Sequence, residues 1–140
     1  MKKWLCWMLM AMLIPTLACQ KQSETEQASA TTENSFLKAM DEYHRVLRPL
    51  MHQALPNQDV AAFKANASAL LQCAETVATT DIPEKFAAQK AQIDSLADAM
   101  LAKTRLFYDA CQGGADAEMF NQFSAAHEDY EALADIVYKL

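Results

Sequence analysis

Apolar side chains recur every three or four residues in four separate blocks between Ser35 and the C-terminus. This spacing places them on one face of an α-helix, so each block predicts an amphipathic helix with one buried face. The chain has only 2 Gly and 4 Pro in 140 residues, whereas sandwiches, barrels and Gly-rich nucleotide-binding folds need many turns. Four helices joined by short turns predict an all-α fold, an antiparallel up-down-up-down four-helix bundle over residues 36–140.

Each predicted helix presents one line of residues to the core. The first helix spans residues 35–55, and Pro49 should interrupt it because its ring lacks an N–H group. The other three begin near Asn57, Asp81 and Asp116, whose side chains can cap a helix N-terminus. The four lines are Leu37, Met40, His44, Leu47, Met51 and Ala54; Val60, Phe63, Ala67, Leu70, Ala74 and Val77; Phe86, Ile93, Ala97, Met100, Thr104 and Phe107; and Phe120, Phe123, His127, Tyr130, Ala134 and Val137.

Residues 1–18 have the organisation of a bacterial export signal. A short basic region, Met1-Lys2-Lys3, precedes an apolar run that is too short to span a membrane as a helix. Ala18-Cys19 resembles the lipobox of bacterial lipoproteins, which implies that Cys19 is lipid-modified and becomes the mature N-terminus. Thr16 stands where that family usually has Leu, and cleavage by ordinary signal peptidase after Ala18 is the alternative.

Residues 19–35 are predicted to form a flexible tether. The stretch from Gln20 to Ser35 contains no aromatic or large aliphatic side chain, so it cannot bury enough surface to fold by itself. In lipoproteins, Gln20 after the cysteine implies sorting to the outer membrane. We therefore expect an exported protein on the periplasmic side of the envelope, attached to the membrane through a lipid on Cys19.

Charge and motifs exclude several classes of function. The net charge is −6 and becomes −8 when Lys2 and Lys3 leave with the signal, which disfavours binding to nucleic acid. The metalloprotease, di-iron, serine-hydrolase and P-loop signatures are all absent from the sequence. The sequence therefore predicts a protein without enzymatic activity.

Two histidines form the most informative pair of polar residues. His44 and His127 both lie on predicted core lines, and counting along the helices puts them and Met100 about 18–20 Å from the same end of the bundle. One interpretation is a pair of core histidines satisfied by nearby carboxylates such as Asp41 and Glu131. The other is a ligand site in which His44, His127 and Met100 face a haem iron or a soft metal such as copper.

Two cysteines remain in the predicted bundle. Cys73 and Cys111 would lie about 30 Å apart along the helix axis, which is too far for a disulfide. Cys73 is therefore predicted to be a small buried residue, and Cys111 a thiol near the turn at Gly113. The C-x-x-C-H motif is absent, which excludes covalent c-type haem attachment.

Several stretches between Met40 and Asp135 resemble cytochrome b562, a periplasmic four-helix bundle. They are Gln53-Ala54, Val60-Ala61-Ala62-Phe63 through Thr79, the region of Pro83, and Phe120-Asn121-Gln122-Phe123 through Tyr130. The resemblance implies one non-covalent haem b, held between a Met near the start of the first helix and a His near the end of the fourth. It also implies electron transfer with a redox partner.

The residues of this chain match that ligand pattern only in part. Met40 lies within one residue of the expected Met, whereas Glu131 occupies the expected His position and His127 lies one turn earlier. The candidate haem ligands are therefore Met40, His44, Met100 and His127, and the candidate metal ligands are His44 and His127. The alternative function is a haem-free envelope lipoprotein that serves as a structural or interaction module and docks another envelope protein.

Overall fold

The computed structural model describes the backbone of residues 18–139 and the side chains of residues 31–139. All regular structure in this part of the chain is helical, which confirms the predicted all-α class. Its four long helices are α1 (Ala18–Pro49), α2 (Val60–Thr79), α3 (Lys90–Gly113) and α4 (Asp116–Tyr138). The predicted signal peptide lies outside the described residues except for Ala18.

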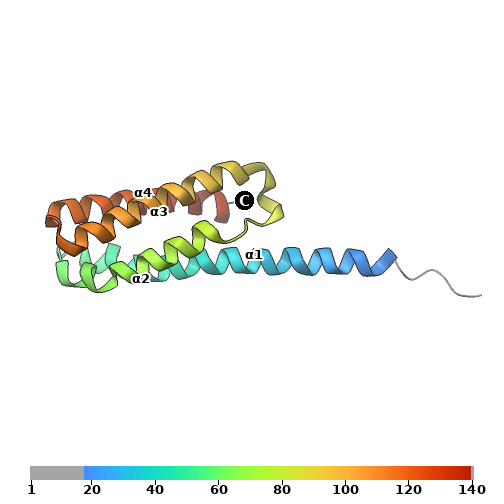
Figure 1. Ribbon diagram of the computed structural model, residues 1–140, viewed down its shortest axis with the longest axis horizontal. Helices are drawn as coiled ribbons and strands as arrows, with labels where there is room; N and C mark the ends of the chain where they lie inside the picture. Colours follow the sequence, from blue (N-terminus) through green and yellow to red (C-terminus); the bar gives the residue numbers. More distant parts are fainter. Residues whose placement is uncertain (1–17, 140) are drawn as a thin grey trace, which may run out of the picture.

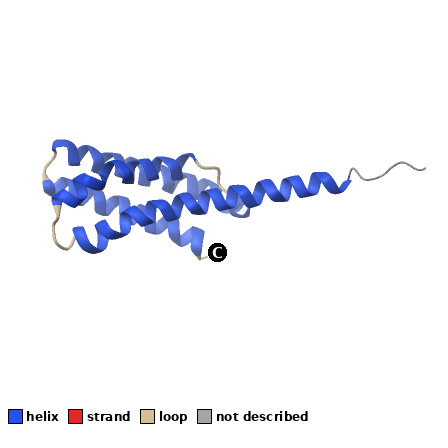
Figure 2. Cartoon of the chain, turned by 90° about the horizontal axis from the view of Figure 1, so that it is seen from below, coloured by secondary structure: helices blue, strands red, loops and turns tan. Residues whose placement is uncertain are grey.

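The long helices lie roughly side by side (Figures 1 and 2). The connection between α1 and α2 and the connection between α3 and α4 lie at the same end of the molecule (Figure 1). The connection between α2 and α3 lies toward the other end. In sequence order, each helix packs against the next, and α3 and α4 are the most closely packed pair.

The core faces of α2 and α3 are those that the sequence predicts. On α2, and from Phe86 to Phe107 before and along α3, every predicted core residue is buried; Val60, at the start of α2, is the exception and is half-buried. Phe63 lies at the centre of an aromatic cluster, with its ring centroid 5.8 Å from Phe107, 5.4 Å from Phe120 and 4.7 Å from Phe123. These edge-on contacts suit the ring quadrupoles and add to the area that the cluster buries.

The core faces of α1 and α4 differ from the prediction. At every second predicted position, the residue immediately before the predicted one is buried in its place. The buried residues are Phe36, Ala39, Met40, Tyr43 and Leu47 on α1, Leu50 and Ala54 on the turn that follows it, and Met119, Phe123, Ala126, Tyr130, Leu133 and Val137 on α4. His44 is exposed and His127 is half-buried, so the prediction that both lie in the core is wrong. The predicted and the observed sets of residues both fit helical spacing. The aromatic rings of Phe36 and Tyr43 have more apolar surface to bury than the side chains of Leu37 and His44.

Residues 19–35 are helical, whereas the sequence predicts a flexible tether. Ala, Gln, Glu and Lys favour helix, and no Gly or Pro interrupts α1 between Ala18 and Pro49. Among the described side chains, the first buried one on α1 is Phe36. The helix before Phe36 extends beyond the rest of the molecule (Figures 1 and 2).

Pro49 ends α1, as predicted from its missing N–H group. The chain continues as a π-helical turn, η1 (Leu50–Ala54), in which the Leu55 N–H donates to the Leu50 carbonyl at 2.8 Å. The wider π-helical bonding pattern allows the chain to keep turning after the lost α-helical bond. Leu50 and Ala54 stay buried through this turn, so the core face of the first helix continues past the proline.

The starts of α2, α3 and α4 differ from the prediction. Asp59, not Asn57, caps α2, because its carboxylate accepts a hydrogen bond of 3.0 Å from the Ala62 N–H. Asp116 is the first residue of α4 and does not cap it. The third α-helix is predicted to begin near Asp81. Instead, a 3-10 helix, η2 (Glu84–Gln89), comes first and α3 begins at Lys90.

Candidate functional site

The four candidate ligands of the predicted haem site do not meet inside the protein. Met40 and Met100 are completely buried, at 0% exposure, within the continuous apolar core. His44 is exposed at the surface. The His127 side chain is 18% exposed.

Tyrosine side chains fill the interior between α1 and α4 at the height where the sequence places the ligands. The Tyr43 ring lies 5.3 Å from the Tyr130 ring, and the Tyr43 hydroxyl lies 3.1 Å from Thr104 Oγ1. Since the Thr104 hydroxyl donates to the Met100 carbonyl at 2.8 Å, Tyr43 is the donor to Thr104. Burial raises the pKa of Tyr43 well above its ordinary value, so this donor stays protonated.

These contacts test whether a haem fits among the residues present. Haem ligation by Met40 or His44 from α1 and His127 from α4 requires an open slot between these helices. The rings of Tyr43 and Tyr130 occupy that position, and His44 stacks on the outer side of Tyr130. The residues present therefore do not fit an interior haem. In the part of the chain with described side chains, no cluster of three or more His, Cys, Asp or Glu residues suits a metal ion.

His44 instead lies in a surface groove between α1 and α4, which we call the α1–α4 groove. The groove has a volume of about 440 Å³, and its walls include Asp41, His44, Tyr130, Glu131, Asp135 and Tyr138. The His44 ring stacks on Tyr130 with centroids 5.5 Å apart and planes inclined by 24°. The Tyr138 hydroxyl donates to Asp41 Oδ1 at 2.8 Å, which joins the two helices across the groove.

Carboxylates dominate the electrostatics of the α1–α4 groove. Burial, followed by the charge of Asp41, raises the pKa of Tyr130 to about 12. Burial and the hydrogen bond to Asp41 also raise the pKa of Tyr138. Both phenols therefore stay neutral at physiological pH, and the negative charge of the groove lies on its three carboxylates.

The neighbouring basic groups compensate this charge only weakly. Lys139 Nζ lies 2.6 Å from Asp135 Oδ1, but both side chains are more than 60% exposed. His127 Nε2 lies 3.6 Å from Glu131 Oε1. An exposed pair such as Lys139 and Asp135 contributes little to stability.

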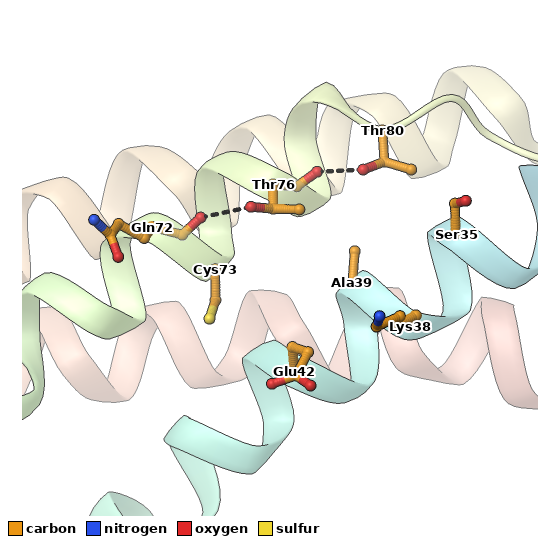
Figure 3. A pocket seen from close by; sticks show the side chains of 8 residues that line it. All are labelled: Ser35, Lys38, Ala39, Glu42, Gln72, Cys73, Thr76 and Thr80. Atoms are coloured by element: carbon orange, nitrogen blue, oxygen red, sulfur yellow. Dashed lines mark hydrogen bonds between the residues drawn. The ribbon is translucent and has the colours of Figure 1, made fainter.

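A second groove, of about 510 Å³, lies between α1 and α2 (Figure 3). The hydroxyls of Thr76 and Thr80 on its wall donate to helix carbonyls at 2.9 Å and 2.6 Å, and so do not face the groove as free donors. Cys73 is half-buried and points toward α1 (Figure 3). Burial raises the pKa of its thiol above the ordinary value, which favours the protonated form.

Cys73, predicted to be buried, is only half-buried and lines the groove between α1 and α2. Cys111 is a free thiol near the turn at Gly113, as predicted, and it is buried at 5% exposure. Burial raises the pKa of the Cys111 thiol to about 11. Both sulfurs are free in the structure.

Comparison with protein families, curated proteins and solved structures finds no match to this chain. No helix within residues 18–139 is both long enough and apolar enough to cross a membrane. The function must therefore be inferred from the residues of the grooves and the core.

Sequence reasoning missed Tyr138 as a wall of the α1–α4 groove. One signal was available, because Tyr138 lies seven residues after Glu131 and three after Asp135, on the same side of a helix. The identity of its partner, Asp41, depends on how α1 and α4 are rotated relative to each other. That rotation is set by the core and cannot be obtained from either helix alone.

Proposed function

We propose that the chain is an antiparallel up-down-up-down four-helix bundle that functions as a haem-free, lipid-anchored binding module. We place it on the periplasmic side of the envelope, at the outer membrane, where it binds ligands or partners without catalysing a reaction. The observation that carries this proposal is the filled interior between α1 and α4, where Tyr43 and Tyr130 pack against each other. The polar groups available for recognition then lie in surface grooves.

The positions of the helix connections support the antiparallel topology. The first and third connections lie at the same end of the molecule, and the second lies toward the opposite end (Figure 1). Each helix would then reverse the direction of the one before it. Short connections of this kind favour antiparallel neighbours in helical bundles.

The continuity of α1 supports a role for the N-terminus as a spacer. The helix between Cys19 and Phe36 has a length of about 26 Å at about 1.5 Å per residue. A lipid on Cys19 would hold the bundle away from the membrane by about this distance. The negative charge of the mature chain also disfavours direct contact with anionic lipid.

A haem titration tests the proposal. The exported chain, purified in detergent, is mixed with haemin and its visible spectrum is recorded against the same chain carrying His127→Ala. We expect both spectra to match that of free haemin in the same detergent. A sharp Soret band with low-spin features that disappears in His127→Ala would refute the haem-free proposal and support a cytochrome. Copper uptake by the unmodified chain, lost in His44→Ala, would likewise refute a metal-free module.

Membrane fractionation tests the anchor. Cys19→Ser should move the protein from the membrane fraction to the soluble fraction, whereas the matched variant Cys73→Ser should stay with the membranes. If Cys19→Ser fractionates like the unmodified chain, the proposed lipid on Cys19 is wrong. Release of the unmodified chain into the soluble fraction would instead support cleavage by ordinary signal peptidase.

A further inference from the structure

We propose that the part of α1 that packs in the bundle, residues 36–49, opens as one unit, hinged at η1, while α2, α3 and α4 stay folded. Both the α1–α4 groove and the groove between α1 and α2 have α1 as one wall, so this opening removes both grooves at once. The inference goes beyond the proposed function and requires neither the lipid anchor nor the absence of haem.

The packing of α1 is one-sided. The backbone of α2 approaches α1 more closely than that of α3 or α4 does, whereas α3 packs closely against both α2 and α4. Grooves of about 510 Å³ and 440 Å³ border α1 on the side of α2 and on the side of α4 (Figure 3). A helix with one close neighbour and open flanks makes fewer dispersion contacts, so its opening costs less free energy than that of a helix packed on two sides.

Long aromatic side chains connect α1 to the elements that lie farther from it. The Tyr43 hydroxyl lies 3.1 Å from Thr104 Oγ1 on α3, and its ring lies 5.3 Å from the Tyr130 ring on α4. Nearer the start of the bundle, the Phe36 ring lies 6.3 Å from the Phe86 ring in η2. Because Phe36 and Tyr43 belong to one continuous helix, these contacts form and break together.

Two of the polar contacts between α1 and the rest of the molecule are exposed. Glu33 Oε1 lies 2.6 Å from Lys85 Nζ, and both side chains are more than 40% exposed. The Tyr138 hydroxyl donates to Asp41, and Tyr138 is 50% exposed. Water can replace either partner in such contacts, so they add little to the cost of opening.

The backbone at the end of α1 already departs from regular α-helical bonding. Pro49 has no N–H group, and the chain continues through η1 with the wider π-helical pattern. In the turn that follows, Gln58 has a φ of 49°, in the left-handed region that residues with a Cβ rarely adopt. A change in direction between α1 and α2 is therefore absorbed in η1 and this turn, and it leaves the interior of α2 unchanged.

The remaining three helices keep a core of their own when α1 opens. The aromatic cluster around Phe63 takes its rings from α2, α3 and α4, since the partners of Phe63 are Phe107, Phe120 and Phe123. Phe107 and Phe123 also lie 5.5 Å from each other. In addition, α3 and α4 are the most closely packed pair of helices. Loss of α1 therefore leaves the best-packed part of the molecule intact.

Native-state hydrogen exchange, measured by mass spectrometry on the full exported chain in detergent, tests the opening. Protection factors of the amides at residues 40–47 of α1 are compared with those at residues 100–107 of α3, without urea and at low urea concentrations. We expect protection in α1 to be lower by about tenfold or more and to depend less on urea, because a partial opening exposes less surface. Equal protection and equal urea dependence would show that α1 leaves only when the whole chain unfolds, and would overturn the inference.

Two variants separate the opening of α1 from global unfolding. Gly114→Ala places a Cβ 2.9 Å from the Ala110 backbone at the end of α3. It should lower the protection of α3 and leave that of α1 unchanged, because α3 stays folded when α1 opens. Tyr43→Phe removes a contact that both processes break, so it should lower the protection of α1 and α3 by the same factor.

An equal loss of protection in α1 and α3 of Gly114→Ala would overturn the inference. So would unchanged protection of α1 in Tyr43→Phe, because its amides would then exchange without leaving the bundle. None of these measurements involves haem or a membrane fraction, so failure of the opening and failure of the proposed function are distinguishable.

Discussion

Replacement of Thr104 by Val should destabilise the protein, because it leaves the buried Tyr43 hydroxyl on α1 without a hydrogen-bond acceptor. Val has nearly the same shape as Thr, so Thr104→Val leaves the packing of α3 unchanged but removes the acceptor of the Tyr43 hydroxyl. Tyr43 is at 0% exposure, so no water can replace that acceptor. An unsatisfied buried donor costs about 1–3 kcal/mol of the free energy of unfolding.

The opposite variant should cost less. In Tyr43→Phe the Thr104 hydroxyl keeps its bond to the Met100 carbonyl, so no buried group is left without a partner. We expect a loss of about 0.5–1.5 kcal/mol, the net contribution of an ordinary hydrogen bond. The double variant should be more stable than the sum of the two single losses implies, because both partners are then absent.

Urea unfolding followed by far-ultraviolet circular dichroism measures these differences. With a slope of about 2 kcal/mol per M, a loss of about 2 kcal/mol in Thr104→Val should lower the midpoint by about 1 M without changing the slope. The reasoning is refuted if Thr104→Val costs no more than Tyr43→Phe, because the Tyr43 hydroxyl would then have another partner. Additive losses in the double variant would equally refute the direct bond.

Three further predictions concern the core, a turn and alkaline pH. Phe63→Ala should cost about 3–5 kcal/mol in urea unfolding, because the three rings around Phe63 cannot close the cavity; a loss below 1 kcal/mol would contradict that packing. Gly114→Ala should lower the urea midpoint, since its Cβ would lie 2.9 Å from the Ala110 backbone, whereas Gly113→Ala meets no atom within 4 Å and should be neutral or stabilising. Burial raises the pKa of the Cys111 thiol from 9.0 to about 11, so the unfolded chain loses this proton at a lower pH than the folded chain. The free energy of unfolding should therefore fall as the pH rises above about 9. A shallower decline in Cys111→Ala would support this assignment, and an unchanged decline would oppose it.

The core face of α3 could be predicted because its sequence offers only one apolar line. Ile93, Ala97, Met100, Thr104 and Phe107 follow helical spacing, and all are buried. Charged residues stand next to several of these positions, so a helix rotated by one residue would bury charges without partners; they are Asp94, Asp98, Lys103 and Arg105. The spacing therefore fixes both the helix and its orientation.

The core face of α1 could not be fixed in the same way. Apolar or aromatic residues stand side by side at positions 36 and 37, 43 and 44, and 50 and 51, so two lines fit the same period. The predicted positions along the bundle axis were close to the observed ones, since Tyr43, the residue before His44, contacts both Thr104 on α3 and Tyr130 on α4. The rotation about the helix axis was wrong, and an error of one residue moved His44 from the predicted interior to the surface.

Because α1 is continuous from Ala18 to Pro49, the number of residues between Cys19 and Phe36 determines which way the bundle faces relative to Cys19. Each residue of an α-helix turns the chain by about 100°, so deleting two residues ahead of Phe36 would swing the α1–α4 groove to the far side relative to Cys19. Deleting seven would bring the groove back to nearly its original azimuth, about 10 Å nearer Cys19. Stand-off and azimuth can therefore be varied separately by choosing the size of the deletion.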